Sequence, residues 1–217
     1  MYRIPRIDCN VACPASLEEA FARTVRETVA CNNWPADFPY APQVGFRIFH
    51  TGADLLLRFD VAERCTAART LDDNGPVWTD SCAEFFFRPE GSDSYYNFEC
   101  NCIGTLLVGH RRDRTQAEHV PAEVLRTVRR RATYPHAPLP ETEGDNRWTL
   151  TLAIPAAALF RDRIAGWDGV QGAMNLYKCG DDLSCPHYLS WRPVGTPAPD
   201  FHRPEFFEPV FFEPKKQ

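Results

Sequence analysis

The 217-residue sequence lacks a long apolar run and lacks an excess of basic residues. No segment approaches the roughly 20 apolar residues that a membrane-spanning helix needs, so we expect no membrane partner. Lys and Arg number 24 against 29 Asp and Glu, and the net charge is −5. Because nucleic-acid binding draws its affinity from clustered cations, we expect no nucleic-acid partner either.

An export signal is also missing from the printed start of the chain. The opening residues, MYRIPRIDCNVACP, have no apolar core of the kind found in secretory signals. As written, the chain is therefore predicted to be cytoplasmic. A secreted or periplasmic location would require that the true start lies upstream.

The sequence has no cysteine framework typical of small disulfide-rich domains. Its nine cysteines are an odd number, and Cys82, Cys100 and Cys102 fall inside apparent strands. We therefore expect reduced, partly buried thiols. A zinc site could draw on Cys100, Cys102, Cys179, Cys185 and His187, but no pair among these residues shows the gap of about two to four residues found in zinc knuckles.

No cofactor is predicted from the sequence. The acidic loops LDDNG (71–75) and CGDDLS (179–184) could hold a structural calcium ion. Hydrated carboxylates in surface turns explain the same residues, and this is the simpler interpretation.

What the sequence does have is a series of short apolar runs rich in aromatic and β-branched residues. The runs QVGFRIFH (43–50) and ADLLLRFDV (53–61) are separated only by Thr51 and Gly52, which predicts a β-hairpin. Further strand-like runs occupy 82–89, 94–104, 147–155, 172–179, 187–191 and 206–213. Such a series without crossover helices favours an all-β fold, a jelly-roll-like sandwich of two antiparallel sheets. We expect one domain over 1–217, with a core sandwich at 43–217 and an N-terminal extension at 1–42.

One or two short helices are expected beside the strands. Ser16 and Glu19 have the spacing of a capping box, and Leu17, Ala20 and Phe21 follow with helical periodicity. A helical turn is also expected in AAALF after Pro155. The proline-rich stretch 31–42 is predicted to cross the surface, and the basic run RTVRRR (126–131) is predicted to form a solvated edge strand.

Two of the five tryptophans stand at strand boundaries beside polar and turn residues. These are Trp78, in NGPVWTDSCAEFFF, and Trp191, in PHYLSWRPVG. Each ring could project from the edge of the sandwich as a flat apolar surface, or it could cap the open end of the core. Trp148 is predicted to lie in the core because it alternates with Leu150 and Leu152, while Trp167, between glycines, fits either place.

Two glutamates fall in apolar strand contexts. Alternation places Glu84 on the same face as Cys82 and Phe86, and it places Glu99 on a polar face with Asn97 and neighbouring residues. A buried carboxylate needs a partner, because burying it unpaired costs several kcal/mol. An ion pair with Arg or Lys would serve, and so would the hydroxyl groups of a ligand.

At these residues the sequence resembles the family 9 carbohydrate-binding modules, in particular the stand-alone bacterial type. The resemblance is carried, in order, by five segments: VWTDSCAEFFF, YYNFECNCIGTLL, RWTLTLAIP, MNLYKCGDDLSCPHYLSWRPV and PDFHRPEFF. It departs from the family in having Glu208 after the paired Phe, where the family usually has Gly. Family modules are usually fused to xylanases or other secreted glycosidases, and some hold structural calcium.

The resemblance implies non-catalytic binding of a mono- or oligosaccharide. A terminal sugar would stack between Trp78 and Trp191, and Glu84 would accept hydrogen bonds from its hydroxyl groups. Asn101, Asn175 and Lys178 would be further polar contacts. The resemblance leaves open which sugar is bound and the oligomeric state.

A hydrolase is the alternative class of function, either a glycoside hydrolase or an accessory part of a polysaccharide-degrading system. Asp80 and Glu84 are the candidate carboxylates, because glycoside hydrolysis needs two carboxyl groups about 5 to 9.5 Å apart. Four residues apart on one strand, they would lie more than about 10 Å from each other, which is a poor geometry. We therefore expect no enzyme activity.

Overall fold

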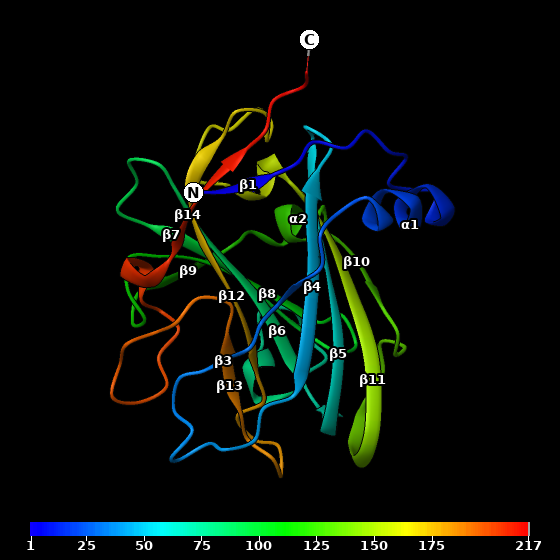
Figure 1. The fold of residues 1–217 in the computed structure, drawn as a ribbon, viewed down its shortest axis with the longest axis vertical. Coiled ribbons are helices and arrows are strands. Elements are labelled where there is room, and N and C mark those ends of the chain that lie inside the picture. The colour runs from blue at the N-terminus through cyan, green and yellow to red at the C-terminus, as the bar shows by residue number, and fades with distance from the viewer. Residues whose placement is uncertain (217) are drawn as a thin grey trace.

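The computed structural model describes residues 1–216, and most of the ordered elements are strands in two sheets (Figure 1). The larger sheet contains β1 (Tyr2–Ile4), β3 (Cys31–Asn32), β6 (Cys82–Pro89), β7 (Tyr95–Asn101), β8 (Leu106–Arg111), β9 (Ala117–His119), β12 (Gln171–Cys179), β13 (Tyr188–Ser190) and β14 (Glu208–Phe212). The smaller sheet contains β2 (Glu27–Thr28), β4 (Gln43–His50), β5 (Asp54–Ala68), β10 (Arg129–Ala132) and β11 (Leu139–Pro155).

The helices are few and short. They are α1 (Pro14–Ala22), α2 (Ala122–Leu125) and three turns of 3₁₀-helix, η1 (Val77–Thr79), η2 (Ala156–Ala158) and η3 (Pro204–Phe206). The predicted all-β sandwich with few helices is therefore confirmed. Within residues 1–216, β1 pairs with β14 in parallel and every other pairing of named strands is antiparallel.

The two sheets order their strands differently from the chain. The nine-stranded sheet runs β1-β14-β12-β6-β7-β8-β9, with β13 beside β12 and β3 beside β13. The five-stranded sheet runs β10-β11-β5-β4-β2. The predicted hairpin is β4 and β5, which pair from Gln43 with Ala62 to His50 with Leu55. The basic run also ends as predicted in an edge strand, β10.

The N-terminal residues depart from the prediction in two places. The capping box is wrong: α1 begins at Pro14, and the Ser16 hydroxyl inside the helix accepts a hydrogen bond from the Asn10 backbone N–H at 3.0 Å. The proline at the first helical position fixes the helical φ and needs no N–H partner. The stretch 31–42 is only partly a surface crossing, because it contains β3 and the buried ring of Trp34, which donates to the Thr196 carbonyl at 2.7 Å.

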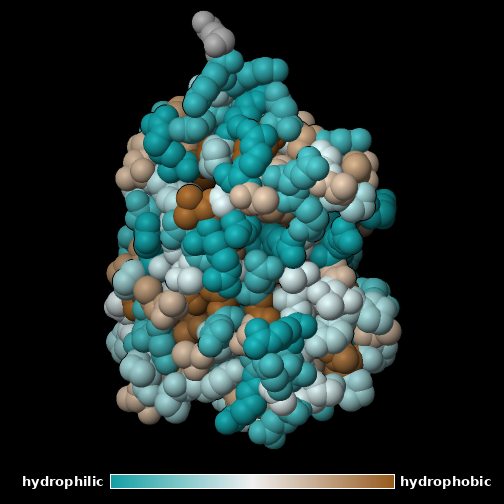
Figure 2. All heavy atoms as spheres, turned by 45° about the vertical axis from the view of Figure 1, so that its right-hand side comes forward, coloured by the Kyte–Doolittle hydropathy of each residue, from teal (hydrophilic) through white to brown (hydrophobic). Residues whose placement is uncertain are grey.

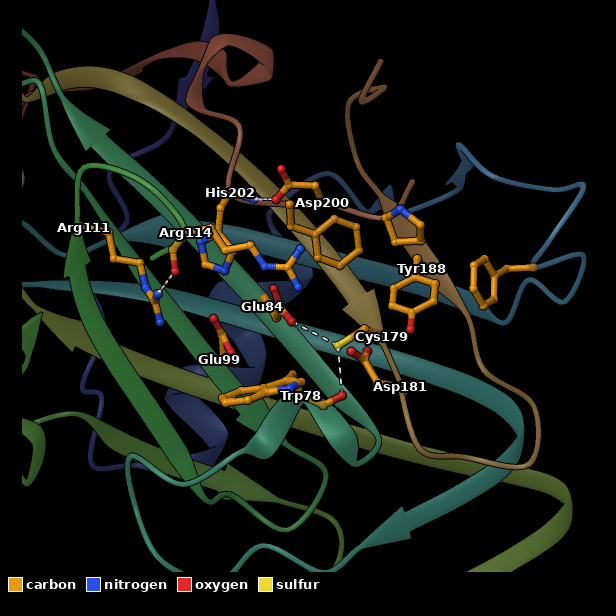
Figure 3. Close-up of a pocket in the computed structure, with 13 residues that line it drawn as sticks. Trp78, Glu84, Glu99, Arg111, Arg114, Cys179, Asp181, Tyr188, Asp200 and His202 are labelled. Carbon is orange, nitrogen blue, oxygen red and sulfur yellow. Dashed lines mark hydrogen bonds between the residues drawn. The ribbon is translucent and has the colours of Figure 1, made fainter. Parts of the chain in front are cut away.

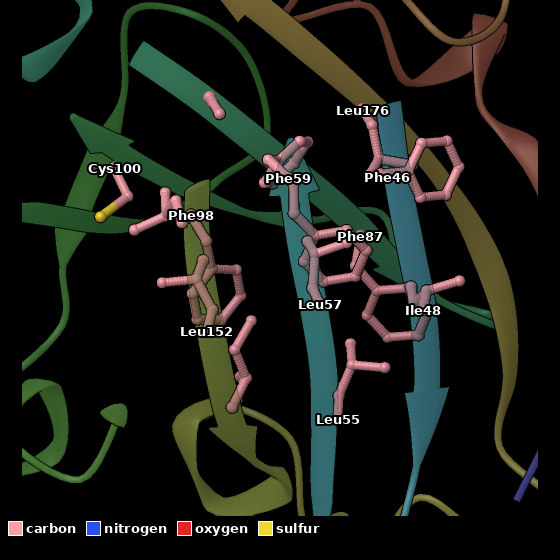
Figure 4. Packing of buried hydrophobic residues seen from close by; sticks show 14 of the residues in the cluster. Phe46, Ile48, Leu55, Leu57, Phe59, Phe87, Phe98, Cys100, Leu152 and Leu176 are labelled. Atoms are coloured by element: carbon pink, nitrogen blue, oxygen red, sulfur yellow. The ribbon is translucent and has the colours of Figure 1, made fainter. Parts of the chain in front are cut away.

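The core lies between the inner faces of the two sheets (Figure 4). Leu57 and Phe59 from β5 meet Phe87 and Phe98 from β6 and β7, and Trp148 and Leu152 of β11 lie in the same cluster. Full burial of such a side chain contributes about 1.5–3 kcal/mol. The predicted core position of Trp148 is confirmed, and Trp167 is buried as well.

The helix α1 covers one part of the outer face of the five-stranded sheet. Leu17 and Phe21 of the helix pack on Phe49 and Leu56, and the Phe21 and Phe49 rings meet edge to face with centroids 5.0 Å apart. Figure 2 shows a face of the molecule that is mostly hydrophilic, with apolar residues in small separate patches. None of the helices in residues 1–216 has the length and apolar character needed to cross a membrane.

Candidate functional site

The outer face of the nine-stranded sheet carries a second set of aligned side chains. Alternation along β6, β7 and β12 turns one set of residues toward the core and the next set outward. The outward set includes Cys82, Glu84 and Phe86 of β6, Glu99 of β7 and Cys179 of β12. Aromatic residues from the C-terminal segments, among them Phe201 and Phe207, pack on this face.

A pocket of about 440 Å³ opens on this outer face (Figure 3). Its size falls in the range of roughly 300–1,000 Å³ that is typical of small-molecule sites. Aromatic rings, carboxyl groups and two guanidinium groups share its lining, which consists of Phe38, Trp78, Glu84, Glu99, Arg111, Arg114, Cys179, Asp181, Tyr188, Pro199, Asp200, Phe201 and His202.

Trp78 forms one side of the pocket. It sits on η1, which begins directly after Pro76, and the residue is 38% exposed. Its backbone carbonyl accepts hydrogen bonds from the Asp181 N–H at 3.2 Å and from Cys179 Sγ at 3.5 Å. The ring is therefore held against the end of β12, with one part free for a ligand.

Glu84 and Glu99 form the floor. The antiparallel register of β6 and β7 places them directly opposite each other, both almost fully buried. Glu84 Oε1 accepts from Cys179 Sγ at 3.0 Å, and Glu99 Oε1 accepts from Asn97 Nδ2 at 2.7 Å. Neither forms an ion pair with a Lys or Arg of residues 1–216.

Burial raises the pKa values of both carboxyl groups in the pocket floor. Burial and the neighbouring Glu99 raise the pKa of Glu84 well above its usual range, and burial raises the pKa of Glu99 to about 7. Burial also raises the pKa of Asp181 to about 6. At neutral pH a fraction of these carboxyl groups is therefore protonated, and a protonated carboxyl group can donate a hydrogen bond as well as accept one.

The opposite wall contains His202 and the two arginines. Arg111 is oriented by two hydrogen bonds, from Nε to Asn97 Oδ1 at 3.0 Å and from Nη1 to the Arg114 carbonyl at 2.8 Å. His202 Nδ1 lies 3.0 Å from the Tyr95 hydroxyl. Burial, with Arg111 and Arg114 nearby, lowers the pKa of His202 to about 3, so its ring is neutral. In Figure 3, Arg114 and His202 lie across from Trp78, with Glu84 and Glu99 between them in this view.

Of the six site residues predicted from the sequence, the structure brings Trp78 and Glu84 together in this pocket. Trp191 lies elsewhere. Its side chain is 4% exposed and belongs to the core between the sheets, where its ring meets Tyr2 and Phe46 edge to face with centroids 5.0 and 5.6 Å away. Of the two interpretations open at the sequence level, this position fits the core cap.

Asn101, Asn175 and Lys178 also lie outside the pocket lining. Asn101 Nδ2 donates to the Thr70 carbonyl at 2.9 Å, and Asn175 Oδ1 accepts from the Arg192 N–H at 3.0 Å, so both amides hold loops in place. Lys178 points to the inner face of the sheet, where its Nζ lies 2.7 Å from a carboxylate oxygen of Glu63.

Asp80, the second carboxylate considered for hydrolysis, does not line the pocket either. Its two oxygens accept hydrogen bonds from the backbone N–H groups of Arg69 and Thr70 at 2.8 and 3.0 Å, and from Asn101 Nδ2 at 3.0 Å. The first two bonds fasten the loop after β5 to the residues before β6, and the third joins the same carboxylate to the end of β7. The Asp80 carboxylate therefore stabilises the fold and does not face the pocket.

Several pocket residues escaped the sequence analysis. Arg111 ends β8 and Arg114 follows it, and no run in the sequence predicts this strand. Asp181 stands out in the sequence only as part of an acidic loop. His202 lies in PDFHRPEFF, a segment noted only for its resemblance to the family. The outward alternation of Glu99 and Asn97 was the one available signal, since it placed polar side chains on the face that carries the pocket.

Metal-ligand atoms gather at one point of the pocket floor. One ligand atom each from Cys82, Glu84 and Cys179 lies within 4.8 Å of the other two, and all three residues are buried. Within residues 1–216, neither of the acidic loops considered for calcium brings three such atoms together in this way.

Comparison with known proteins agrees with the geometry. The sequence model of carbohydrate-binding family 9 matches residues 13–212. A candidate carbohydrate-binding protein from Bacteroides uniformis is 39% identical, with 97% of this chain and 98% of that chain covered and a TM-score of 0.91. The search of curated proteins finds no match.

Two more distant structures share the fold. A family 9 carbohydrate-binding module from Caldicellulosiruptor kristjanssonii in complex with glucose superimposes with a TM-score of 0.60 at 8% identity, covering 99% of this chain and 97% of that one. A module of the same family and organism in complex with cellotriose gives a TM-score of 0.55 at 8% identity, with 99% and 94% covered.

Proposed function

The chain belongs to carbohydrate-binding family 9, a family of non-catalytic sugar-binding modules, and from this premise we propose that its ligand site is the pocket beside Trp78. The observation that carries the proposal is the exposed Trp78 ring standing over two buried carboxyl groups, Glu84 and Glu99. A flat apolar surface beside fixed polar groups suits a sugar ring, which presents C–H faces and a rim of hydroxyl groups.

Stacking on Trp78 supplies the apolar part of the contact. An indole ring offers a large flat surface at little conformational cost. Since Trp191 is buried in the core, we propose that the second wall comes from the rings of Phe38, Tyr188 and Phe201, which line the same pocket. The sugar would then be held between Trp78 and this aromatic wall.

The floor carboxyls supply the polar part. A sugar hydroxyl both donates and accepts hydrogen bonds, and Glu84 and Glu99, which share protons near neutral pH, can do the same. The guanidinium of Arg114 adds donors on the opposite side, with no ion pair to a carboxylate of residues 1–216. Each such bond to a charged group is worth about 1.5–3 kcal/mol.

We propose a glucose-type ring at the end of a cello-oligosaccharide as the ligand class. This rests on the two Caldicellulosiruptor kristjanssonii modules of the same fold, which bind glucose and cellotriose. The pocket volume of about 440 Å³ suits one or two rings and not a long chain. The dissociation constant is expected between about a micromolar and a millimolar value, or −8 to −4 kcal/mol.

Isothermal titration calorimetry tests the proposal, with glucose, cellobiose, cellotriose, xylose and xylo-oligosaccharides as ligands. A reducing-sugar assay on the same mixtures measures cleavage. We expect binding of the gluco-oligosaccharides without product. Product release would contradict a non-catalytic role, and binding of xylo-oligosaccharides alone would replace the proposed ligand class.

The variant Trp78→Ala locates the site. Loss of the stacking surface should reduce affinity by about 2 kcal/mol or more, the size of a binding hot spot. Leu71→Ala is the matched control, because Leu71 is 37% exposed but does not line this pocket. Equal affinities for the two variants would place the saccharide elsewhere.

A further inference from the structure

The floor of the pocket holds two thiols that saccharide binding does not use, beside the Glu84 carboxyl group that it does use. Cys82 and Cys179 are direct partners in the register between β6 and β12, and Glu84 follows two residues later on the same face. Cys179 Sγ donates to Glu84 Oε1 at 3.0 Å, as the dashed line in Figure 3 shows. Two rigid neighbouring strands therefore present two thiols and a carboxyl group to one point.

The spacing of these atoms suits a small tetrahedral ion. Around Zn²⁺, sulfur lies at ~2.3 Å and carboxylate oxygen at ~2.0–2.2 Å, which puts neighbouring ligand atoms ~3.5–3.8 Å apart. The three ligand atoms here already lie within 4.8 Å of one another. Small rotations of the side chains would close the remaining difference without moving the strands.

The surroundings of the three ligand residues give a cation a path from solvent and place further carboxyl groups nearby. Glu84 and Cys179 line the pocket, so an ion can reach the cluster from solvent. Glu99 faces Glu84 across the strands, and Asp181 lies two residues after Cys179. None of these three carboxyl groups forms an ion pair with a Lys or Arg in the part of the chain that the structure describes. A divalent cation would favour the ionised form of these carboxyl groups and offset the negative charge that ionisation places in the buried site.

A second thiol pair in the molecule provides the contrast. Cys65 and Cys185 lie together in a separate small cluster, where Arg64 donates to Cys185 Sγ from Nη2 at 2.6 Å and from Nε at 3.0 Å. There the sulfur already has a guanidinium beside it. Beside Cys179 at the pocket floor, the neighbouring group is instead the Glu84 carboxyl group. A carboxyl group attracts a cation, whereas the guanidinium beside Cys185 is itself a cation.

We propose that Cys82, Cys179 and Glu84 bind one thiophilic divalent cation, of which Zn²⁺ is the type, with its fourth coordination position facing the pocket. Binding forms two Zn–S bonds and one Zn–O bond, and the thiol protons of Cys82 and Cys179, together with any proton held by Glu84, leave to solvent. No redox change is involved. A water molecule would complete the tetrahedron, as in other zinc sites with three protein ligands.

Cobalt substitution tests the site in the reduced, metal-stripped protein. Co²⁺ should bind at one ion per chain and give sulfur-to-cobalt charge-transfer absorption and tetrahedral ligand-field bands, both of which added Zn²⁺ should abolish. The double variant Cys82→Ser/Cys179→Ser should lose the charge-transfer absorption. The matched double variant Cys65→Ser/Cys185→Ser should keep it, and the reverse pattern would overturn the proposal.

X-ray absorption of the zinc-loaded wild-type protein tests the ligand set without any substitution, in case the serine variants fold poorly. Two sulfur atoms at ~2.3 Å with lighter atoms at ~2.0–2.2 Å are expected. A first shell without sulfur would refute the site. These readouts are independent of saccharide, so a protein that binds zinc but no sugar, or sugar but no zinc, would separate this inference from the proposed function.

Discussion

Lys178 and Cys179 are neighbours in β12, but they point to opposite faces of the nine-stranded sheet. On the inner face, Lys178 Nζ lies 2.7 Å from Glu63 and 2.7 Å from His187 Nε2, and Glu63 also accepts from Trp148 Nε1 at 2.6 Å. On the outer face, Cys179 meets Glu84, which has no cationic partner in residues 1–216. Both faces bury charge, but only the inner one neutralises it within the protein.

This difference separates structure from function on a single sheet. A buried carboxylate that is paired with a cation has little capacity left for a ligand, whereas buried carboxyls without a cation keep theirs. Lys178 was predicted as a ligand contact from the same segment that supplies the pocket. Its inward position instead gives it a partner in the other sheet, and the following residue reaches the site.

The largest expected effect comes from breaking the inner ion pair. Lys178→Met should lower the free energy of unfolding by about 3–5 kcal/mol, because it leaves the Glu63 carboxylate buried without compensation. Urea denaturation measures the loss. The double variant Lys178→Met/Glu63→Gln should recover much of it, and Lys215→Met, at an exposed lysine, should change nothing. A single variant as stable as the wild type would mean that the inner charges are not coupled.

The two tryptophans give the next comparison. Trp191→Ala should lower the free energy of unfolding by about 3–5 kcal/mol, because it empties a well-packed core position. Trp78→Ala should cost less than about 1 kcal/mol in stability, since the ring is partly exposed, while it weakens saccharide binding by about 2 kcal/mol or more. Thermal or urea denaturation measures the stability of both variants, and titration calorimetry measures their saccharide affinity. If Trp191→Ala kept its stability and lost binding, the result would support the stacking of the sugar between Trp78 and Trp191 that the family resemblance implies.

The sequence predicted the sandwich because strand periodicity is local. The alternation of Val44, Phe46 and Ile48 is readable in one segment. The same alternation in β6 predicts that Glu84 shares a face with Cys82 and Phe86, and the structure agrees. The pocket is not local. Arg111, Asp181 and His202 come together only through the strand order β12-β6-β7-β8 and the loops that cover it.

The position of Trp191 shows the same limit. A boundary residue has no alternation on one side, so its direction depends on which strand its segment approaches. The chain after β13 passes over Asn175, and this fixes Trp191 N–H to the Leu176 carbonyl at 2.8 Å and turns the ring inward. No pattern within PHYLSW carries that information.

Removing one charge from the outer pair tests the other half of the comparison. Glu84→Gln keeps the shape of the side chain and relieves the repulsion with Glu99, so the free energy of unfolding should stay level or rise. Saccharide affinity should fall by about 1.5–3 kcal/mol, the value of a hydrogen bond to a charged group. Calorimetry and urea denaturation measure the two effects.

Glu143→Gln is the control for that variant, because Glu143 is exposed and lies outside the pocket. It should change neither affinity nor stability. A Glu84→Gln variant that lost stability without losing affinity would mean that Glu84 resembles the inner charges and belongs to the fold.

Acid should act on the inner network through His187. Burial and the nearby Lys178 lower the pKa of His187 to about 3, against an unfolded value of about 6.5, so the folded state excludes a proton that the unfolded state binds. The stability that this provides is complete above pH ~6.5 and is lost as the pH falls toward 3, by about 2 kcal/mol at pH ~5. His187→Gln keeps an acceptor for Lys178 and cannot be protonated, so it should flatten the fall in unfolding free energy between pH ~7 and ~5, measured by urea denaturation at each pH. His119→Gln, at an exposed histidine, should leave that slope unchanged. An unaltered slope in His187→Gln would show that the inner charges hold the network whether or not the histidine is neutral.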